Sequence, residues 1–154
     1  MGALENRIPP PLVATLFGLL MWLAARQLPG VLALAIEWRA GLALVVLLVG
    51  VAICMAGVLS FRHARTTVNP LKPETASALV SSGVYRYTRN PMYLGFATAL
   101  LAWSIYLAWP PALLGVLGFV LYMNRFQIGP EERALAGLFG GDFVQYCSQV
   151  RRWL

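Results

Sequence analysis

Long apolar stretches separated by two polar segments make up most of the chain. The apolar stretches run over residues 10–28, 41–61, 92–109 and 110–128. A helix needs about 20 apolar residues to cross a bilayer, so all four stretches are candidate membrane spans, although the first and third are short. The stretch 41–61 carries no charged residue and is the clearest candidate. Pro110 and Pro111 separate the last two stretches so tightly that we predict a helical hairpin.

The two polar segments cover residues 62–91 and 129–154. Within the first, residues 73–83 are predicted to form a short helix that ends at Gly83. The second begins with Pro130, which suits the first position of a helix, and Gly140 interrupts that helix. Residues at helical spacing after this break share one apolar face, and they are Phe143, Tyr146, Val150 and Trp153. We therefore predict an amphipathic helical tail.

The composition agrees with a membrane protein. Hydrophobic residues make up 59% of the 154 residues and charged residues only 12%, against about 25% charged residues in soluble domains. The mean hydropathy is +0.69. We expect a single domain over residues 1–154, an all-α integral membrane protein with about four transmembrane helices, a connecting segment, a helical tail and no Rossmann domain.

The basic residues predict the orientation of this bundle. Cytoplasmic segments of membrane proteins carry an excess of Lys and Arg. Placing the N-terminus inside puts ten of the twelve basic residues on the cytoplasmic side and leaves only Arg26 and Arg39 outside. Both termini, the connecting segment and the tail are then cytoplasmic. We expect a multi-pass protein of the bacterial inner membrane.

Several function classes are disfavoured by what the sequence lacks. The net charge of +6 comes from few residues and has no aromatic-plus-basic pattern, so no nucleic-acid partner is expected. Cys54 and Cys147 have no metal-binding spacing, so no metal is expected. None of the four stretches has an ionisable residue near its centre, which argues against an ion-coupled transporter. Polar chemistry is therefore expected at the cytoplasmic interface.

The densest polar cluster is "GVYRYTRNPMYLG", residues 83–95. Asn90 suits the N-cap of a helix that starts at Pro91, and it equally suits a binding site. Arg89 is either a membrane-edge anchor or a donor to a carboxylate or phosphate. Gly95, one turn into the helix, allows a ligand or another backbone to come close.

Three charged residues near the tail also have two interpretations. Glu131 and Glu132 stabilise a helix N-terminus, or they bind a cationic group of a ligand. Neighbouring residues point about 100° apart on a helix, so only one of the two carboxylates is expected to face any given ligand. Arg125 either extends its side chain to the interface or faces inward toward the other polar groups.

These motifs resemble the isoprenylcysteine carboxyl methyltransferase family, within the wider phospholipid methyltransferase-like membrane enzymes. The resemblance rests on "GVYRYTRNPMYLG", a helical hairpin of about 35 residues, and then "EERALAGLFGGDFVQY" with "VRR". It covers about residues 83–152. Asn90 stands where the family often has His, and Phe143 replaces a Tyr. The sequence also stops at Leu154, so we expect little protein to remain for shaping a bulky-substrate site.

The resemblance implies that S-adenosylmethionine binds between the hairpin and the tail on the cytoplasmic side. The sulfonium and ammonium of this cofactor require carboxylates, its own carboxylate requires Arg or backbone N–H groups, and its adenine requires an apolar slot. Carried over position by position, the implied cofactor-binding residues are Tyr85, Arg89, Asn90, Pro91, Tyr93, Leu94, Gly95, Glu131, Glu132, Tyr146 and Arg151. We expect Glu132 and Arg125 to be the catalytic residues, and we hypothesise that Arg125 orients an anionic acceptor or steadies the cofactor.

The predicted function is therefore an integral-membrane, S-adenosylmethionine-dependent methyltransferase. Its acceptor is expected to be lipidic or amphipathic and to enter from the bilayer: a prenylcysteine-like carboxylate, a phospholipid amine or a small thiol. Methyl transfer depends on alignment and on the exclusion of water more than on a general base. The alternative is a non-catalytic membrane module that binds a ligand or a partner protein.

Overall fold

The computed structural model describes residues 5, 7–64 and 77–154, and in these residues all regular structure is helical. The main helices are α1 (Pro10–Gln27), α2 (Ile36–His63), α3 (Pro91–Leu107), α4 (Leu113–Met123) and α5 (Gly129–Gln149). Three short elements connect them: the 3₁₀ turns η2 (Gly83–Arg86) and η3 (Pro110–Ala112), and the π-helical turn η4 (Asn124–Ile128). The prediction of an all-α protein is confirmed for the described residues.

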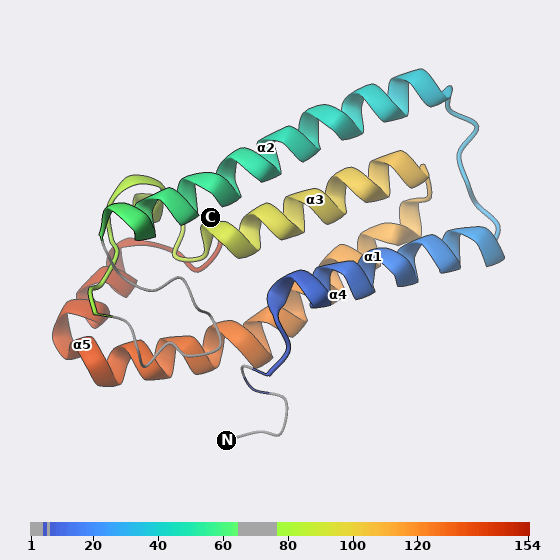
Figure 1. The fold of residues 1–154 in the computed structure, drawn as a ribbon. Coiled ribbons are helices and arrows are strands. Elements are labelled where there is room, and N and C mark those ends of the chain that lie inside the picture. Colours follow the sequence, from blue (N-terminus) through green and yellow to red (C-terminus); the bar gives the residue numbers. More distant parts are fainter. Residues whose placement is uncertain (1–4, 6, 65–76) are drawn as a thin grey trace.

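The helices form an elongated bundle with two distinct ends (Figure 1). At the loop end, residues 28–35 join α1 to α2 and η3 joins α3 to α4. At the tail end, α2 finishes, α3 begins and α5 lies across the bundle. Trp109 ties the loop end together by donating a hydrogen bond from its Nε1 to the carbonyl oxygen of Pro29, 3.1 Å away. The loop end is thus closed by short connections, and the polar segments meet at the tail end.

Paired glycines allow α2 and α3 to pack with their backbones in contact. A Cβ atom added to Gly95 would lie 2.7 Å from the carbonyl oxygen of Gly50. A Cβ atom added to Gly50 would lie 2.9 Å from the carbonyl oxygen of Gly95. Both distances are too short for any other residue, and small residues at helix contacts are characteristic of membrane bundles. The space beside Gly95 is therefore filled by the α2 backbone.

The apolar stretches have the character of membrane helices to different degrees. The most apolar window of α2 has a mean hydropathy of 3.0, yet only 17% of it is buried inside the protein. A helix that is apolar on all sides and little buried by protein requires lipid around it. The helical run Pro110–Gln149 also meets the length and hydropathy of a span, whereas α3 is apolar but shorter. These helices, by length and composition, support a membrane protein.

The tail differs in two places from a plain helix. Gly140 has φ +52° and ψ −122°, so the chain is non-helical there, as the break predicted at this residue requires. After α5 the chain runs back toward the start of α3, where it ends (Figure 1). Phe143, Tyr146 and Val150 form a small apolar cluster of their own, while Trp153 packs against the main core. The predicted apolar face of the tail thus packs on protein.

One predicted element is wrong. The helix expected over residues 73–83 is absent from residues 77–82, which have no helical turn, and residues 73–76 lie outside the described part of the chain. Gly83 has φ +62° and begins the turn η2 rather than ending a helix. Ser81 and Ser82, just before it, favour local turns over helix, which explains why the helix does not reach Gly83.

Candidate functional site

The two motifs that are distant in sequence meet through the backbone at the tail end. The backbone N–H of Arg89 donates to the carbonyl oxygen of Arg151 at 3.0 Å. The side-chain amide of Asn90 donates to the carbonyl oxygen of Arg152 at 2.9 Å. Thr88 is fully buried beneath this contact, and its hydroxyl accepts from the backbone N–H of Asn90. The last residues of the chain are therefore fixed against the start of α3.

Asn90 occupies the N-cap position of α3 but does not cap the helix with its side chain. Its φ of −132° is non-helical, Pro91 follows at the first helical position, and no cap hydrogen bond is formed by its side chain. The side-chain amide points to the tail instead, as described above. The Asn90 side chain therefore joins the start of α3 to the end of the chain and does not cap the helix.

Glu132 is the centre of a charged cluster. Its carboxylate lies 3.1 Å from the Nη1 atom of Arg89. The guanidinium of Arg152 donates to both oxygens of the same carboxylate, with the Nε contact at 3.1 Å. The side chains of Arg89 and Glu132 are only 16% and 22% exposed, so this network is screened by water less than a surface ion pair. We name Arg89, Glu132 and Arg152 the charged triad.

Glu131 faces a different set of partners, although it is the neighbour of Glu132. Its carboxylate accepts hydrogen bonds from the hydroxyl of Tyr93 and from Gln127, which is 2% exposed. Burial raises the pKa of Glu131 to about 7, and the nearby charge of Glu132 acts in the same direction. The hydrogen bonds from Tyr93 and Gln127 lower it. Glu131 thus titrates near neutral pH at the edge of the triad.

Two tyrosines close the other side of this region. The hydroxyl of Tyr146 donates to the carbonyl oxygen of Tyr85 at 2.8 Å. The ring of Tyr85 packs edge-on against Phe61 at the end of α2, with 5.4 Å between ring centroids. Burial raises the pKa of both tyrosines, so both hydroxyls keep their protons. The tail, the turn η2 and the end of α2 are joined here by neutral hydrogen-bonding side chains.

The structure brings together most of the residues that the sequence singled out. Side chains of the following residues meet at the tail end: Tyr85, Arg89, Asn90, Tyr93, Glu131, Glu132 and Tyr146. Arg151 contributes its carbonyl oxygen, while its side chain is exposed. Pro91 and Gly95 pack against α2, opposite Gly57 and Gly50. Leu94 is half-buried, and its backbone N–H bonds back to Asn90 within the first helical turn.

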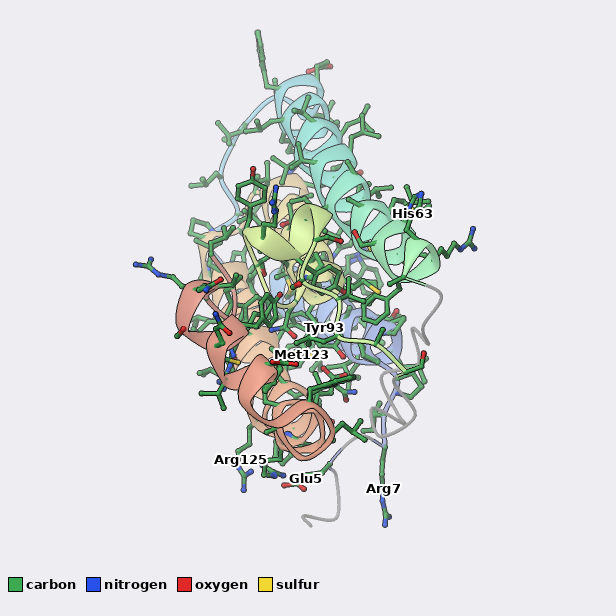
Figure 2. All side chains as sticks on the ribbon, turned by 90° about the vertical axis from the view of Figure 1, so that its left-hand side faces the viewer. Glu5, Arg7, His63, Tyr93, Met123 and Arg125 are labelled. Atoms are coloured by element: carbon green, nitrogen blue, oxygen red, sulfur yellow. The ribbon has the colours of Figure 1, made fainter. Side chains whose placement is uncertain are left out.

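Arg125 lies apart from these residues. Its side chain is 67% exposed and its Nη1 atom is 3.6 Å from the carboxylate of Glu5. Figure 2, viewed from the tail end, shows Arg125 and Glu5 together at the edge of the molecule and Tyr93 near its centre. Arg125 therefore faces outward, and this position does not support the catalytic role expected for it.

Sequence reasoning missed two members of the site. Gln127 lies one helical turn before Glu131, and residues four apart on a helix share a face, so this spacing was a usable signal. Arg152 was not among the predicted site residues, because the sequence does not show which of two neighbouring arginines faces inward. The chain leaves the helix at Val150, with φ −123° and ψ 132°, and this extended turn directs Arg152 to Glu132.

The donor set fits the charges of S-adenosylmethionine. The Nε of Arg89 is buried and has no hydrogen-bond partner within the described residues, so it is available to a carboxylate ligand. The carboxylate of Glu131, whose partners are the neutral side chains of Tyr93 and Gln127, lies in the same region for a cationic group. No group of three or more potential metal ligands occurs in the part of the chain that the structure describes.

The fold and site define a class: an all-helical membrane protein whose buried ionisable groups gather at one end of an apolar bundle. Residues 38–142 match the family described as phospholipid methyltransferase. Since this match covers more than half of the sequence, the chain belongs to the phospholipid methyltransferase family. No solved structure matches it.

Individual relatives agree with this assignment. An uncharacterized protein of Haemophilus influenzae is 46% identical over 63 residues, which are 41% of this chain and 100% of that protein. Protein-S-isoprenylcysteine O-methyltransferase A of Arabidopsis thaliana is 28% identical over 116 residues, 73% of this chain and 57% of that enzyme. Protein-S-isoprenylcysteine O-methyltransferase of Saccharomyces cerevisiae is 30% identical over 91 residues, 57% of this chain and 37% of that enzyme. The predicted family resemblance is confirmed, although the chain spans little more than half the length of the matched plant enzyme.

Proposed function

We propose that the chain is an integral-membrane methyltransferase that uses S-adenosylmethionine at the tail end of the bundle. The observation that carries the proposal is the charged triad, because it joins the two sequence motifs through partly buried ionic contacts. The membership of the phospholipid methyltransferase family supports the same reaction class. The cofactor carries a methyl group on a sulfonium. The acceptor takes this methyl group by direct displacement, and S-adenosylhomocysteine is the leaving group.

The residues of the site have distinct roles in this proposal. Glu131 attracts a cationic group of the cofactor, Glu132 holds the guanidinium of Arg89 in place, and the free Nε of Arg89 donates to the cofactor carboxylate. Tyr93 and Gln127 fix the Glu131 carboxylate in one orientation. Asn90 holds the tail closed over the start of α3. Arg125 is omitted, because it is exposed and paired with Glu5.

The topology proposed is a single domain with four spans, close to α1, α2, α3 and the run from η3 to η4. Both termini and the tail end face the cytoplasm, because ten of the twelve basic residues then lie inside. The acceptor is a lipidic or amphipathic molecule that reaches the tail end from the bilayer. Its reacting atom is a carboxylate oxygen, an amine nitrogen or a thiolate sulfur.

The first experiment is calorimetric titration of the purified full chain with S-adenosylmethionine and with S-adenosylhomocysteine. We expect binding by the wild-type protein and a loss of about tenfold to a hundredfold in Arg89→Gln, the range that one to two charged hydrogen bonds provide. Arg133→Gln is the matched control, because Arg133 is an exposed arginine that forms an ion pair with Glu5, away from the charged triad. Unchanged binding in Arg89→Gln would reject the site.

A turnover assay separates the enzyme from the non-catalytic alternative. Protein that binds the cofactor is incubated with radiolabelled S-adenosylmethionine and a total bacterial lipid extract, and methyl transfer into the lipid and the thiol fractions is counted. Label in one fraction, absent in Arg89→Gln, would establish the enzyme and narrow the acceptor. Binding without any transfer would instead favour the ligand-binding module.

A further inference from the structure

An apolar groove lies between α2 and α3 toward the loop end, far along the bundle from the charged triad. Its volume is about 310 Å³. Four alanines and four larger side chains line it: Ala40, Ala43, Ala99, Ala102, Leu44, Leu47, Trp103 and Tyr106. Alanines on both helices leave the space that larger side chains would fill. The groove opens on the surface where α2 exposes leucines and valines, and lipid covers such a surface in a membrane protein.

Arg39 stands at this groove with an unused hydrogen-bond donor. Its guanidinium carbon lies 5.8 Å from the centroid of the Tyr106 ring, and Tyr106 stacks on Trp103 at 5.4 Å with 15° between the ring planes. The Nε of Arg39 is buried and has no partner among the residues that the structure describes. A buried donor without an acceptor is costly. The aromatic pair thus holds a guanidinium beside an apolar groove and leaves one of its N–H groups unpaired.

Arg26 shows that this placement is not a general property of arginine at the loop end. Arg26 also lies over an aromatic ring, with 5.1 Å between its guanidinium carbon and the centroid of Trp22. Its side chain is exposed, however, at the end of α1, and it has no buried unpaired donor. Of the two, only Arg39 combines a cation, an orphaned buried N–H and an adjoining groove.

We propose that the groove and Arg39 form a binding site for one anionic phospholipid of the bilayer. The phosphate accepts from the guanidinium of Arg39, since arginine matches phosphate with two parallel hydrogen bonds. One acyl chain lies along the alanines, where each buried methylene contributes about 0.8 kcal/mol. The site is independent of the proposed methyl transfer, because it uses none of the residues at the tail end and lies at the opposite end of α2 and α3.

The chemistry of the site favours a phospholipid over a free anion. A groove whose lining is almost entirely apolar gives inorganic phosphate little beyond the single guanidinium, whereas a phospholipid fills the groove and pairs the charge at once. A zwitterionic lipid carries a choline next to its phosphate and so competes with Arg39 for that phosphate. An anionic head group such as phosphatidylglycerol is therefore preferred.

The test uses the full chain in neutral detergent with three probes: phosphatidylglycerol, phosphatidylcholine with the same acyl chains, and glycerol phosphate alone. Native mass spectrometry counts retained lipid, and the unfolding temperature reports stabilisation by bound ligand. The proteins are wild type, Arg39→Gln, the matched control Arg26→Gln, and Ala99→Leu, which fills the groove. Unfolding temperatures without lipid establish that each variant is folded.

We expect wild type and Arg26→Gln to retain one phosphatidylglycerol and to unfold at a higher temperature with it. Arg39→Gln should bind it about tenfold more weakly, the loss of one charged hydrogen bond, and Ala99→Leu should also bind it more weakly. If Arg39→Gln does not fold, the Ala99→Leu result alone decides. Equal binding of both lipids, an equal stabilisation by glycerol phosphate, or an equal loss in Arg26→Gln would each overturn the proposal.

Discussion

Glu132 and Glu5 each form ion pairs with two arginines, but the two clusters differ in their position and in the exposure of their side chains. Glu132 joins Arg89 and Arg152 at the centre of the tail end. Glu5 joins Arg125 and Arg133 at the edge of the molecule, as Figure 2 shows for Glu5 and Arg125. The arginines are 16% and 38% exposed in the first case and 67% and 60% exposed in the second, whereas the carboxylates are 22% exposed for Glu132 and 10% exposed for Glu5.

This difference in exposure decides what each bridge contributes. Removing one partner of a buried ion pair leaves charges that water does not reach, and this is strongly destabilising. Removing Glu5 leaves two exposed arginines that water solvates, and the effect is small. The same Arg–Glu–Arg pattern is therefore part of the proposed site in one region, where the arginines are more enclosed, and a contact of two exposed arginines in the other. The predictions below test this contrast.

The largest effect is expected from Glu132→Gln. The substitution keeps the shape of the side chain but leaves Arg89 and Arg152 facing each other without a negative charge between them. We expect S-adenosylmethionine binding to fall by about a hundredfold, which corresponds to about 2.7 kcal/mol. Isothermal titration of the purified protein measures it. Glu37→Gln is the control, since Glu37 is an exposed acid in the first turn of α2; an equal loss in both variants would remove the distinction between site and surface.

A large effect on stability is expected from Gly95→Ala, which acts on the site without touching its charges. The added Cβ would lie 2.7 Å from the carbonyl oxygen of Gly50 and 2.8 Å from the Cβ of Cys54. Helices α2 and α3 must separate, and such overpacking costs about 2 kcal/mol. Urea unfolding in detergent measures the free energy of unfolding.

The control for Gly95→Ala is Gly137→Ala. A Cβ on Gly137 meets nothing within 4 Å, so this substitution should stabilise α5 by up to about 1 kcal/mol through helix propensity. An equal change in the free energy of unfolding for Gly95→Ala and Gly137→Ala would contradict the close contact between α2 and α3. A loss confined to Gly95→Ala would show that the start of α3, and with it Arg89, depends on this contact.

A pH effect is expected from Glu131, and its sign follows from the raised pKa. The folded protein binds a proton at Glu131 up to about pH 7, whereas the ordinary value is 4.5. Between these values the folded state holds more protons than the unfolded state, so this residue makes stability fall as pH rises from about 4.5 to about 7. The side chain is partly exposed, so the change is on the order of 1 kcal/mol.

Glu131→Gln isolates this contribution. The amide does not titrate, so the fall in unfolding temperature between pH 5 and pH 8 should be smaller in the variant than in the wild-type protein. The other titrating groups remain in both proteins, and the difference between the two curves belongs to Glu131. Parallel curves would show that the carboxylate is solvated and that its pKa is ordinary.

Sequence reasoning predicted the helices well because their causes are local. Apolar runs of bilayer length, prolines at helix starts and Gly140 at the break are visible in the chain. Helices α1 and α3 lie close to the apolar stretches 10–28 and 92–109, whereas α2 extends beyond the stretch 41–61 at both ends. The helix over 73–83 failed in its described part because the sequence around Ser81 and Ser82 suits a turn equally well. The helix or turn preference of single residues is a weak predictor of secondary structure where no apolar pattern supports it.

The site was predictable only in part, because its assembly depends on contacts between distant residues. The motif residues Arg89, Tyr93 and Glu131 were found, but the direction of each side chain was not. Asn90 looked like a helix cap, and only the fold shows that its amide reaches Arg152. Arg125 was expected in the site and Arg152 was not, although both are arginines. In the fold the Arg125 side chain is exposed, whereas the extended turn at Val150 brings Arg152 to Glu132.

The smallest effect is expected from Glu5→Gln, the counterpart of Glu132→Gln. Arg125 and Arg133 are both more than half exposed, so water replaces the lost carboxylate and stability should change by less than about 1 kcal/mol. Cofactor binding should be unchanged, because none of these three residues contacts the charged triad. The measurement is the same titration and the same urea curve as for Glu132→Gln, at low and at high salt. The Glu5 contribution should vanish at high salt, since exposed ion pairs are screened, while the Glu132 contribution should persist. A Glu5→Gln variant that lost cofactor binding would show that the edge of the molecule and the tail-end site act as one network.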